Sequence, residues 1–180
     1  MRVIGLDPGS RRTGFGVVEG EGNRFHCVKS GHVSVSAKLD LPHRLHTIVE
    51  KIGAILDEFA PDAVAVEEAF YHESVRSTLV LGHVRGALLV AAVSRGIAVA
   101  EYTPREIKMS VTGHGGATKD QVAFMVQRVL ALRGPLSPDA ADALATALCH
   151  HHRSRLKVPK RAVTAAARTL EALLARRVAR

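Results

Sequence analysis

The sequence predicts an α/β fold: a mixed five-stranded sheet with helices on both faces. Three observations support this. Short apolar runs at residues 2–6, 63–66 and 98–102 are typical of buried parallel strands. A glycine-rich turn at 20–23 joins two further strands into an antiparallel hairpin. Between and after these strands, apolar residues recur every third or fourth position, which indicates helices that cover the sheet.

Each predicted helix has a local signal of its own. Capping boxes begin helices at Thr103 and at Thr118, and Ser137-Pro138 begins the last one. Gly96 suits the end of the second helix. In chain order we expect strands at 2–6, 15–19 and 25–35, a helix at 41–59, a strand at 63–66, a helix at 79–94, a strand at 98–102, and helices from 104, from 118 to about 132 and from 137 to about 151.

Positive charge is concentrated at the carboxyl-terminal end of the chain. The protein has 180 residues and a net charge of +8, and nine of its Lys and Arg lie in the last 28 residues with one acid, Glu171. Residues 1–152 are then balanced, with 16 basic and 16 acidic side chains. We therefore expect a domain at 1–152 and a basic extension at 153–180, either helical or disordered. Such an extension favours a polyanion, either nucleic acid or an anionic membrane surface, unless it only keeps the protein in solution.

Nothing in the sequence indicates export or a membrane span. No signal peptide is evident, the apolar stretch at 87–93 is too short to cross a bilayer, and Cys27 and Cys149 lack metal or redox spacing. We expect a cytoplasmic, nucleoid-associated protein with no membrane partner.

Four carboxylates occupy positions from which they can converge. Asp7 and Glu67 follow two apolar strands, while Asp139 and Asp142 are three residues apart near the start of the last helix. Ligands gather at the carboxyl ends of parallel strands, and residues three apart share a helix face. Oxygen ligands favour Mg²⁺ or Mn²⁺ over zinc, and two such ions about 4 Å apart suit in-line attack on a phosphodiester. Taken singly, each acid could equally cap a helix or pair with a neighbour.

Five segments of the chain form a pattern. They are Asp7-Pro8-Gly9-Ser10 with Thr13-Gly14-Phe15-Gly16, then residues 65–70, 81–86, 102–108 and 139–145. In this order and spacing they resemble the RuvC family, the bacterial Holliday-junction resolvases of the ribonuclease-H-like superfamily. The resemblance spans residues 1 to about 152.

The resemblance implies an activity and a set of partners. It implies Mg²⁺-dependent hydrolysis by a homodimer, in which each subunit nicks one of two opposed strands of a four-way DNA junction and leaves 5′-phosphate and 3′-hydroxyl ends. It also implies RuvA and RuvB, the branch-migration complex, as partners. Matched residue by residue, the resemblance implies that Asp7, Glu67, Asp139 and Asp142 are the catalytic and metal-binding residues. Glu68 follows Glu67 directly, and spacing alone does not decide which of these two is the ligand.

Five further residues are candidates for DNA contact. Phe70 matches a family aromatic that stacks on a base near the junction centre, and Tyr71 adjoins it. Lys108 and Lys119 match phosphate-contacting positions, and Arg76 is a candidate backbone contact, as are Arg11 and Arg12. Each also has a plain alternative, a core aromatic or a solvated charge.

Two other features of the sequence have more than one interpretation. The helix around 79–93 is apolar nearly all round, which suits either the dimer surface or a buried core helix. His150, His151 and His152 lack the spacing of metal ligands and are better explained as cations at a helix end.

Three other functions compete with a resolvase. A phosphotransferase of the actin and sugar-kinase group also ends its first strand in Asp before a Gly-Ser turn, but it needs a second lobe and a second phosphate loop. A junction-binding protein that does not cut leaves the carboxylates unexplained. An RNA-cleaving nuclease of the same superfamily would not require the final Asp pair and the basic tail together.

Overall fold

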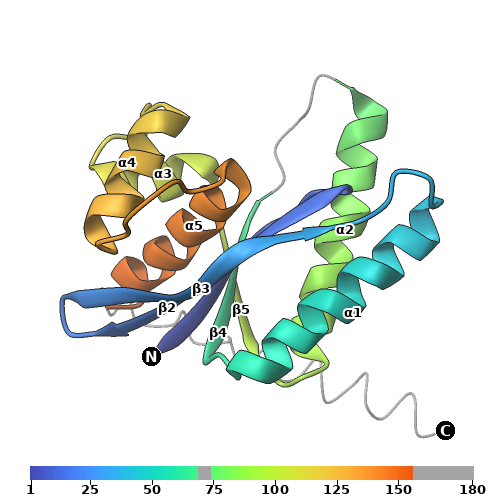
Figure 1. Cartoon of the computed structure of the whole chain (residues 1–180), viewed down its shortest axis with the longest axis horizontal. Helices are drawn as coiled ribbons and strands as arrows, with labels where there is room; N and C mark the ends of the chain where they lie inside the picture. The colour runs from blue at the N-terminus through green and yellow to red at the C-terminus, as the bar shows by residue number, and fades with distance from the viewer. Residues whose placement is uncertain (69–73, 156–180) are drawn as a thin grey trace, which may run out of the picture.

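The computed structural model describes residues 1–68 and 74–155, which form a five-stranded mixed sheet with helices on both faces (Figure 1). The strand order is β3-β2-β1-β4-β5, in which β1 pairs parallel with β4 and β4 with β5, whereas β1–β2 and β2–β3 are antiparallel. The predicted fold class and the predicted adjacency of the first and fourth strands are confirmed. The strands are β1 (Arg2–Asp7), β2 (Arg12–Glu21), β3 (Arg24–Ser34), β4 (Ala63–Glu67) and β5 (Ala98–Tyr102).

The helices are divided between the two faces of the sheet. Figure 1 shows α1 and α2 on one side and α3, α4 and α5 on the other. Both capping boxes predicted at Thr103 and Thr118 are present, and the Ser137 side chain accepts from the Ala140 amide at the start of α5. The helices are α1 (Leu41–Phe59), α2 (Val75–Val93), α3 (Pro104–Thr112), α4 (Lys119–Val129) and α5 (Pro138–Arg155).

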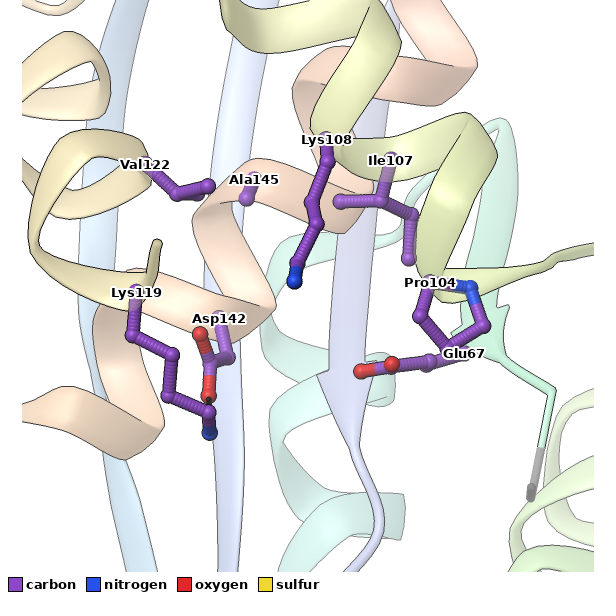
Figure 2. A pocket seen from close by; sticks show the side chains of 8 residues that line it. All are labelled: Glu67, Pro104, Ile107, Lys108, Lys119, Val122, Asp142 and Ala145. Atoms are coloured by element: carbon purple, nitrogen blue, oxygen red, sulfur yellow. Dashed lines mark hydrogen bonds and ion pairs between the residues drawn. The ribbon is translucent and has the colours of Figure 1, made fainter. Parts of the chain in front are cut away.

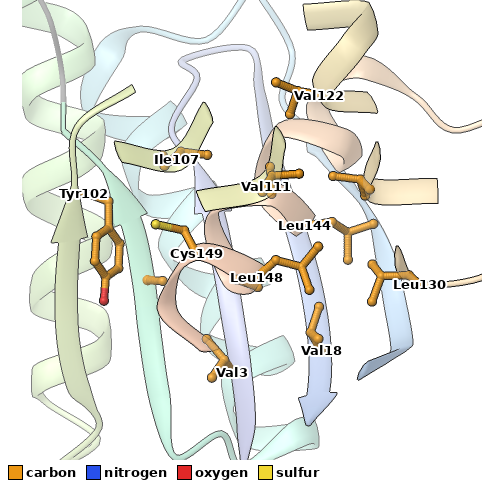
Figure 3. Close-up of a cluster of buried hydrophobic side chains, with 14 of the residues drawn as sticks. Val3, Val18, Tyr102, Ile107, Val111, Val122, Leu130, Leu144, Leu148 and Cys149 are labelled. Carbon is orange, nitrogen blue, oxygen red and sulfur yellow. The ribbon is translucent and has the colours of Figure 1, made fainter. Parts of the chain in front are cut away.

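Each face has its own hydrophobic core. Beneath α1 and α2, side chains such as Ile4, Ile52 and Leu88 are completely buried. Beneath α3 to α5, a second cluster surrounds Leu144 and Leu148 (Figure 3). Because successive side chains of a strand point to opposite faces, each central strand contributes to both cores.

Glycines allow α5 to lie unusually close to the sheet. A Cβ added at Gly5 would lie 1.9 Å from the Ala143 carbonyl oxygen, and one at Gly14 would lie 2.1 Å from the Asp139 carbonyl oxygen. A Cβ added at Gly16 would likewise collide with the Leu144 side chain, at 2.7 Å. Only residues without a side chain fit under this helix, so these glycines fix the depth at which α5 crosses β1 and β2.

Several element boundaries differ from the sequence prediction. The hairpin turn is tighter, with β2 extending to Glu21 and β3 starting at Arg24, and β2 begins at Arg12 rather than residue 15. Its ladder to β3 continues past the glycines, with a bulge between Val17 and Val18. Helix α2 begins at Val75 because the Ser74 side chain caps it.

Helix α2 is apolar around most of its circumference. Val84, Leu88 and Ala92 are buried against the sheet, whereas Val75 and Val90 are both 66% exposed. It is the one helix in the described ranges that is long and apolar enough to cross a membrane by length and composition, a test that core helices of globular proteins also pass. The outward side of α2 is therefore an apolar surface on the described part of the protein.

Candidate active site

Two carboxylates are brought together by adjacent parallel strands. Leu6 of β1 is paired with Val66 of β4, so that Asp7 and Glu67 each follow the last paired residue of neighbouring strands. Both side chains point toward the α5 face by strand alternation, because Gly5, two residues before Asp7, lies directly under α5. The side-by-side arrangement expected from the sequence is therefore present.

Helix α5 carries the other two acids over the same strand ends. The Asp139 carbonyl lies above Gly14, which is the residue paired with Asp7 across β1 and β2. Asp142 lies one turn further along and lines a small pocket together with Glu67. The close approach of α5 is what places both acids near Asp7, and the sequence analysis did not identify the glycines that permit it.

The carboxylates influence one another strongly. Burial, then the charges of Asp142 and Glu67, raise the pKa of Asp7 to about 7, and Asp139 contributes least to this rise. Burial and the charge of Asp142 also raise the pKa of Glu67. Such shifts are expected where acids share a site with little solvent, and they are common at functional sites.

Two lysines provide positive charge in the same pocket. Lys108 of α3 and Lys119 at the start of α4 both point toward the acids (Figure 2). The Lys119 ammonium group lies 2.8 Å from Asp142 Oδ2, and this hydrogen bond raises the pKa of Lys119. Both lysines lower the pKa of Glu67, which places them within electrostatic reach of the acids. Pro104, Ile107, Val122 and Ala145 complete the lining, and the sequence analysis had not singled out any of them.

The donor set has the chemistry of a site for a hard divalent cation. It offers carboxylate oxygens alone, and a bound cation would relieve the repulsion that raises the pKa of Asp7. As the side chains stand, residues 1–68 and 74–155 contain no group of three His, Cys, Asp or Glu gathered closely enough to hold a metal ion. A cation held by three or more of these acids would therefore require their side chains to move closer together.

Three other candidates for DNA contact, Arg11, Arg12 and Arg76, do not line this pocket. Arg76 is exposed in the first turn of α2, and Arg11 and Arg12 are exposed in and just after the turn that follows Asp7. Phe70 and Tyr71 lie outside the described residues.

The three consecutive histidines contact other parts of the fold and do not stand free at the end of a helix. His151 is 1% exposed, and its Nε2 lies 3.1 Å from the Val18 carbonyl oxygen. Burial lowers the pKa of His150, whose Nδ1 lies 2.9 Å from the Tyr102 hydroxyl. His152 Nδ1 lies 3.1 Å from the Ser110 carbonyl oxygen. The expectation of cations at a helix end is therefore wrong for His150 and His151, which are part of the packing beneath α5.

Comparison with known proteins agrees with this geometry. The family model "Crossover junction endodeoxyribonuclease RuvC" matches residues 3–150. Relatives of that name from Syntrophomonas wolfei and Bordetella avium are 45% and 47% identical over 157 residues, covering 87% of this chain and 91% and 87% of those proteins.

Solved structures show the same likeness. The T. thermophilus RuvC in complex with Holliday junction substrate superposes with a TM-score of 0.82 at 37% identity, covering 87% of this chain and 96% of that one. The yeast mitochondrial Holliday junction resolvase Ydc2, at 13% identity and a TM-score of 0.65, shares the fold. The match over nearly the whole described sheet and its helices shows that this chain belongs to the RuvC family of crossover junction endodeoxyribonucleases.

Proposed function

We propose that this protein resolves Holliday junctions by hydrolysing phosphodiesters at the site formed by Asp7, Glu67, Asp139 and Asp142. The observation that carries the proposal is the meeting of two strand-end carboxylates with the acids of α5, opposite two lysines in one pocket. Family membership supports the reaction, and the T. thermophilus relative was solved with a Holliday junction. A junction-binding protein that does not cut would have no use for these acids, although their mutual repulsion is unfavourable.

The protein's own groups have distinct parts in this reaction. Lys108 and Lys119 attract a strand phosphate into a pocket whose acids would otherwise repel it. Asp7 and Glu67 extend from adjacent ends of paired strands, so the backbone that carries them is already in place when the substrate arrives and only the side chains need to move. Near neutral pH the Asp7 carboxyl retains a proton about half of the time, and it must give up that proton to act as a ligand.

A divalent metal ion is implied by membership of the family. Mg²⁺ or Mn²⁺ is the choice we propose, with two ions per site, because the donors are oxygens. When bound, such ions supply Lewis-acid charge at the phosphate and an activated water. Asp7, Glu67, Asp139 and Asp142 are the residues that would hold them.

We also propose that the protein acts as a homodimer through the exposed side of α2. Val75, Leu79, Val90 and Val93 are each at least 60% exposed and follow one another at helical spacing on one side. Gly82 and Gly86 lie between them on the same stripe, and a Cβ at either would meet nothing within 4 Å. A stripe with glycines at its centre suits close packing against a second copy, which would give one active site for each of two opposed strands.

The other assignments rest partly on the family resemblance and partly on sequence position and charge. We propose base stacking by Phe70 with Tyr71 beside it, and backbone contact by Arg76. We further propose a nuclease domain at 1–152 with a basic DNA-binding extension at 153–180. We also propose that the branch-migration proteins RuvA and RuvB are its partners and that it is associated with the nucleoid.

The test is cleavage of a synthetic four-way junction beside linear duplex of the same sequence, with Mg²⁺ or Mn²⁺. We expect paired nicks in opposed strands of the junction and none in the duplex. Asp7→Asn should bind the junction and lose about 10²–10³-fold or more in cleavage rate, as expected when a group that stabilises the transition state is removed. Equal cleavage of linear duplex would contradict the proposal, as would an Asp7→Asn variant that cuts normally.

A further inference from the structure

We propose that the carboxyl-terminal end of α5 is a clasp that positions α3, and through α3 sets the place of Lys108 in the active site. The clasp consists of His150, His152 and Arg153, with their partners Tyr102, Glu106 and Ser110 on β5 and α3. The inference rests on the proposed function, since Lys108 matters only if this pocket receives a phosphate. It gives the histidines a positioning role in place of the cationic role that their sequence suggested.

Two edges of helix α3 contact different parts of the protein. Pro104 and Lys108, one turn apart, line the active-site pocket (Figure 2). Glu106 and Ser110, also one turn apart, lie along another edge and contact the end of α5. Because the two edges belong to one short helix, any rotation of α3 about its axis moves Lys108 together with the anchored edge.

The anchored edge is held by two side chains of α5. Arg153 Nη2 lies 2.9 Å from Glu106 Oε1, while Glu106 Oε2 accepts from the Thr103 amide at 3.0 Å and so completes the helix cap. His152 Nδ1 lies 3.1 Å from the Ser110 carbonyl oxygen and 3.0 Å from its hydroxyl. A carbonyl oxygen can only accept, so Nδ1 of His152 carries the proton in this contact. One α5 contact thus reaches the first turn of α3 and another its last turn.

A third contact fixes the strand that leads into α3. The Tyr102 hydroxyl lies 2.9 Å from His150 Nδ1. Burial lowers the pKa of His150 and raises the pKa of Tyr102 to about 12, so the contact joins a neutral imidazole to a protonated phenol. Tyr102 is paired with Glu67, and its carbonyl oxygen accepts from the Glu68 amide at 2.9 Å. In Figure 3 its ring lies beside Cys149 of α5, so the same residue adjoins an active-site carboxylate and the clasp.

These contacts make α5 the common support of both kinds of charge in the site. Near its start α5 carries Asp142, and at its other end it holds the helix that carries Lys108. The distance between lysine and carboxylate is then set by one continuous helix. A displacement of about 1 Å in a positioning group can cost on the order of 10²-fold in rate, so a modest loosening of α3 is measurable.

The experiment is a double-mutant cycle on single-turnover cleavage of a saturating four-way junction. Tyr102→Phe removes the contact with His150, and His152→Phe removes the two contacts with Ser110. Both keep an aromatic ring, and each is combined with Lys108→Met. We expect each single clasp variant to slow cleavage about 10-fold and to cause no further slowing once Lys108 is absent, because coupled residues are not additive. Slowing that multiplies in the double variants would overturn the inference.

Arg95→Ala is the matched control. It removes an ion pair to Asp57 on the opposite face of the sheet, far from α3 in the fold. Its effect on cleavage should be small and should multiply with that of Lys108→Met. Thermal unfolding of every variant separates lost positioning from lost fold, and Tyr102→Phe and His152→Phe serve as independent versions of the same test.

Each remaining outcome also has a meaning. If the wild-type protein leaves the junction intact, the proposed function fails and the clasp loses its purpose. If the wild type cuts and Lys108→Met cuts equally fast, the proposed function stands and the positioning inference fails. Wild-type cleavage rates in both clasp variants likewise contradict the inference.

Discussion

On the α1 and α2 face of the sheet, aliphatic helix residues pack on aliphatic strand residues, and the charged groups are at most partly buried. On the α5 face, glycines bring a helix backbone almost onto the strands, acids are drawn partly inside, and imidazole and phenol groups hydrogen-bond beneath the helix. The first face is stabilised by burial, which is non-directional and tolerant of detail. The stability of the second face depends on how closely the α5 backbone approaches the strands, and this face carries the candidate site.

The sharpest way to break this comparison is to change one methyl group on each face, adding it on one and removing it on the other. For Gly5→Ala, the new Cβ would meet the Ala143 carbonyl oxygen at 1.9 Å and the Ala147 amide nitrogen at 2.7 Å, both backbone atoms that cannot rotate away. We expect a loss of about 4 kcal/mol or more in unfolding free energy, at the upper end of overpacking effects. Urea unfolding followed by circular dichroism measures it.

The matched change on the other face is Ile52→Val, which removes one methyl group from a completely buried side chain of α1. It should cost about 1 kcal/mol and leave junction cleavage unaffected. If Gly5→Ala were tolerated as well as Ile52→Val, the close seating of α5 would not be the constraint that we describe.

These glycines also explain what could not be predicted from the sequence. The apolar run before Asp7 and the one before Glu67 identify strands, and parallel pairing then places both acids at one edge. Helix α1 follows from its periodicity. The depth of α5 depends on contacts between residues far apart in sequence, such as Gly14 with Asp139, and an isolated glycine in a strand has several local explanations.

The polar contacts of the α5 face escaped prediction for the same reason. His150 and His151 resemble exposed cations as long as their neighbours are unknown. Tyr102 and Val18, which supply the partners, are about 48 and 133 residues away along the chain. Local sequence therefore predicted the acids at strand ends, whereas the groups that hold their surroundings in place required the tertiary structure.

The second comparison concerns charge, and Asp7→Asn tests it through stability. The pKa of Asp7 is raised from 3.8 to about 7, first by burial and then by Asp142 and Glu67, so the folded state without metal disfavours the ionised form. The stability that Asp7 contributes is therefore fully present below about pH 4 and is lost as pH rises toward 7. In EDTA we expect Asp7→Asn to be more stable than wild type by about 2 kcal/mol at pH 8, with the gain vanishing near pH 4.

The full shift corresponds to a larger gain, but the neutral Asn also gives up its attraction to Lys119. Asp57→Asn on the other face is the control, because its pKa is lowered by the hydrogen bond from Arg95 and its replacement should bring no gain at any pH. Differential scanning calorimetry from pH 4 to 8, with and without Mg²⁺, makes the comparison. A gain that is equal at pH 4 and pH 8 would show that the repulsion at Asp7 is not its source.

The smallest expected effect belongs to the ion pair on the α1 and α2 face. Arg95 Nε and Nη2 lie 2.7 and 3.1 Å from the two carboxylate oxygens of Asp57, and its Nη1 donates to the Ala91 carbonyl oxygen at 3.1 Å. The Asp57 side chain is 62% exposed, so water and salt screen the pair. We expect Arg95→Ala to lower Tm by about 2 °C or less and to leave the junction cleavage rate unchanged. A much larger fall in Tm would mean that directional polar contacts also support this face, and the contrast between the two faces would then be one of degree.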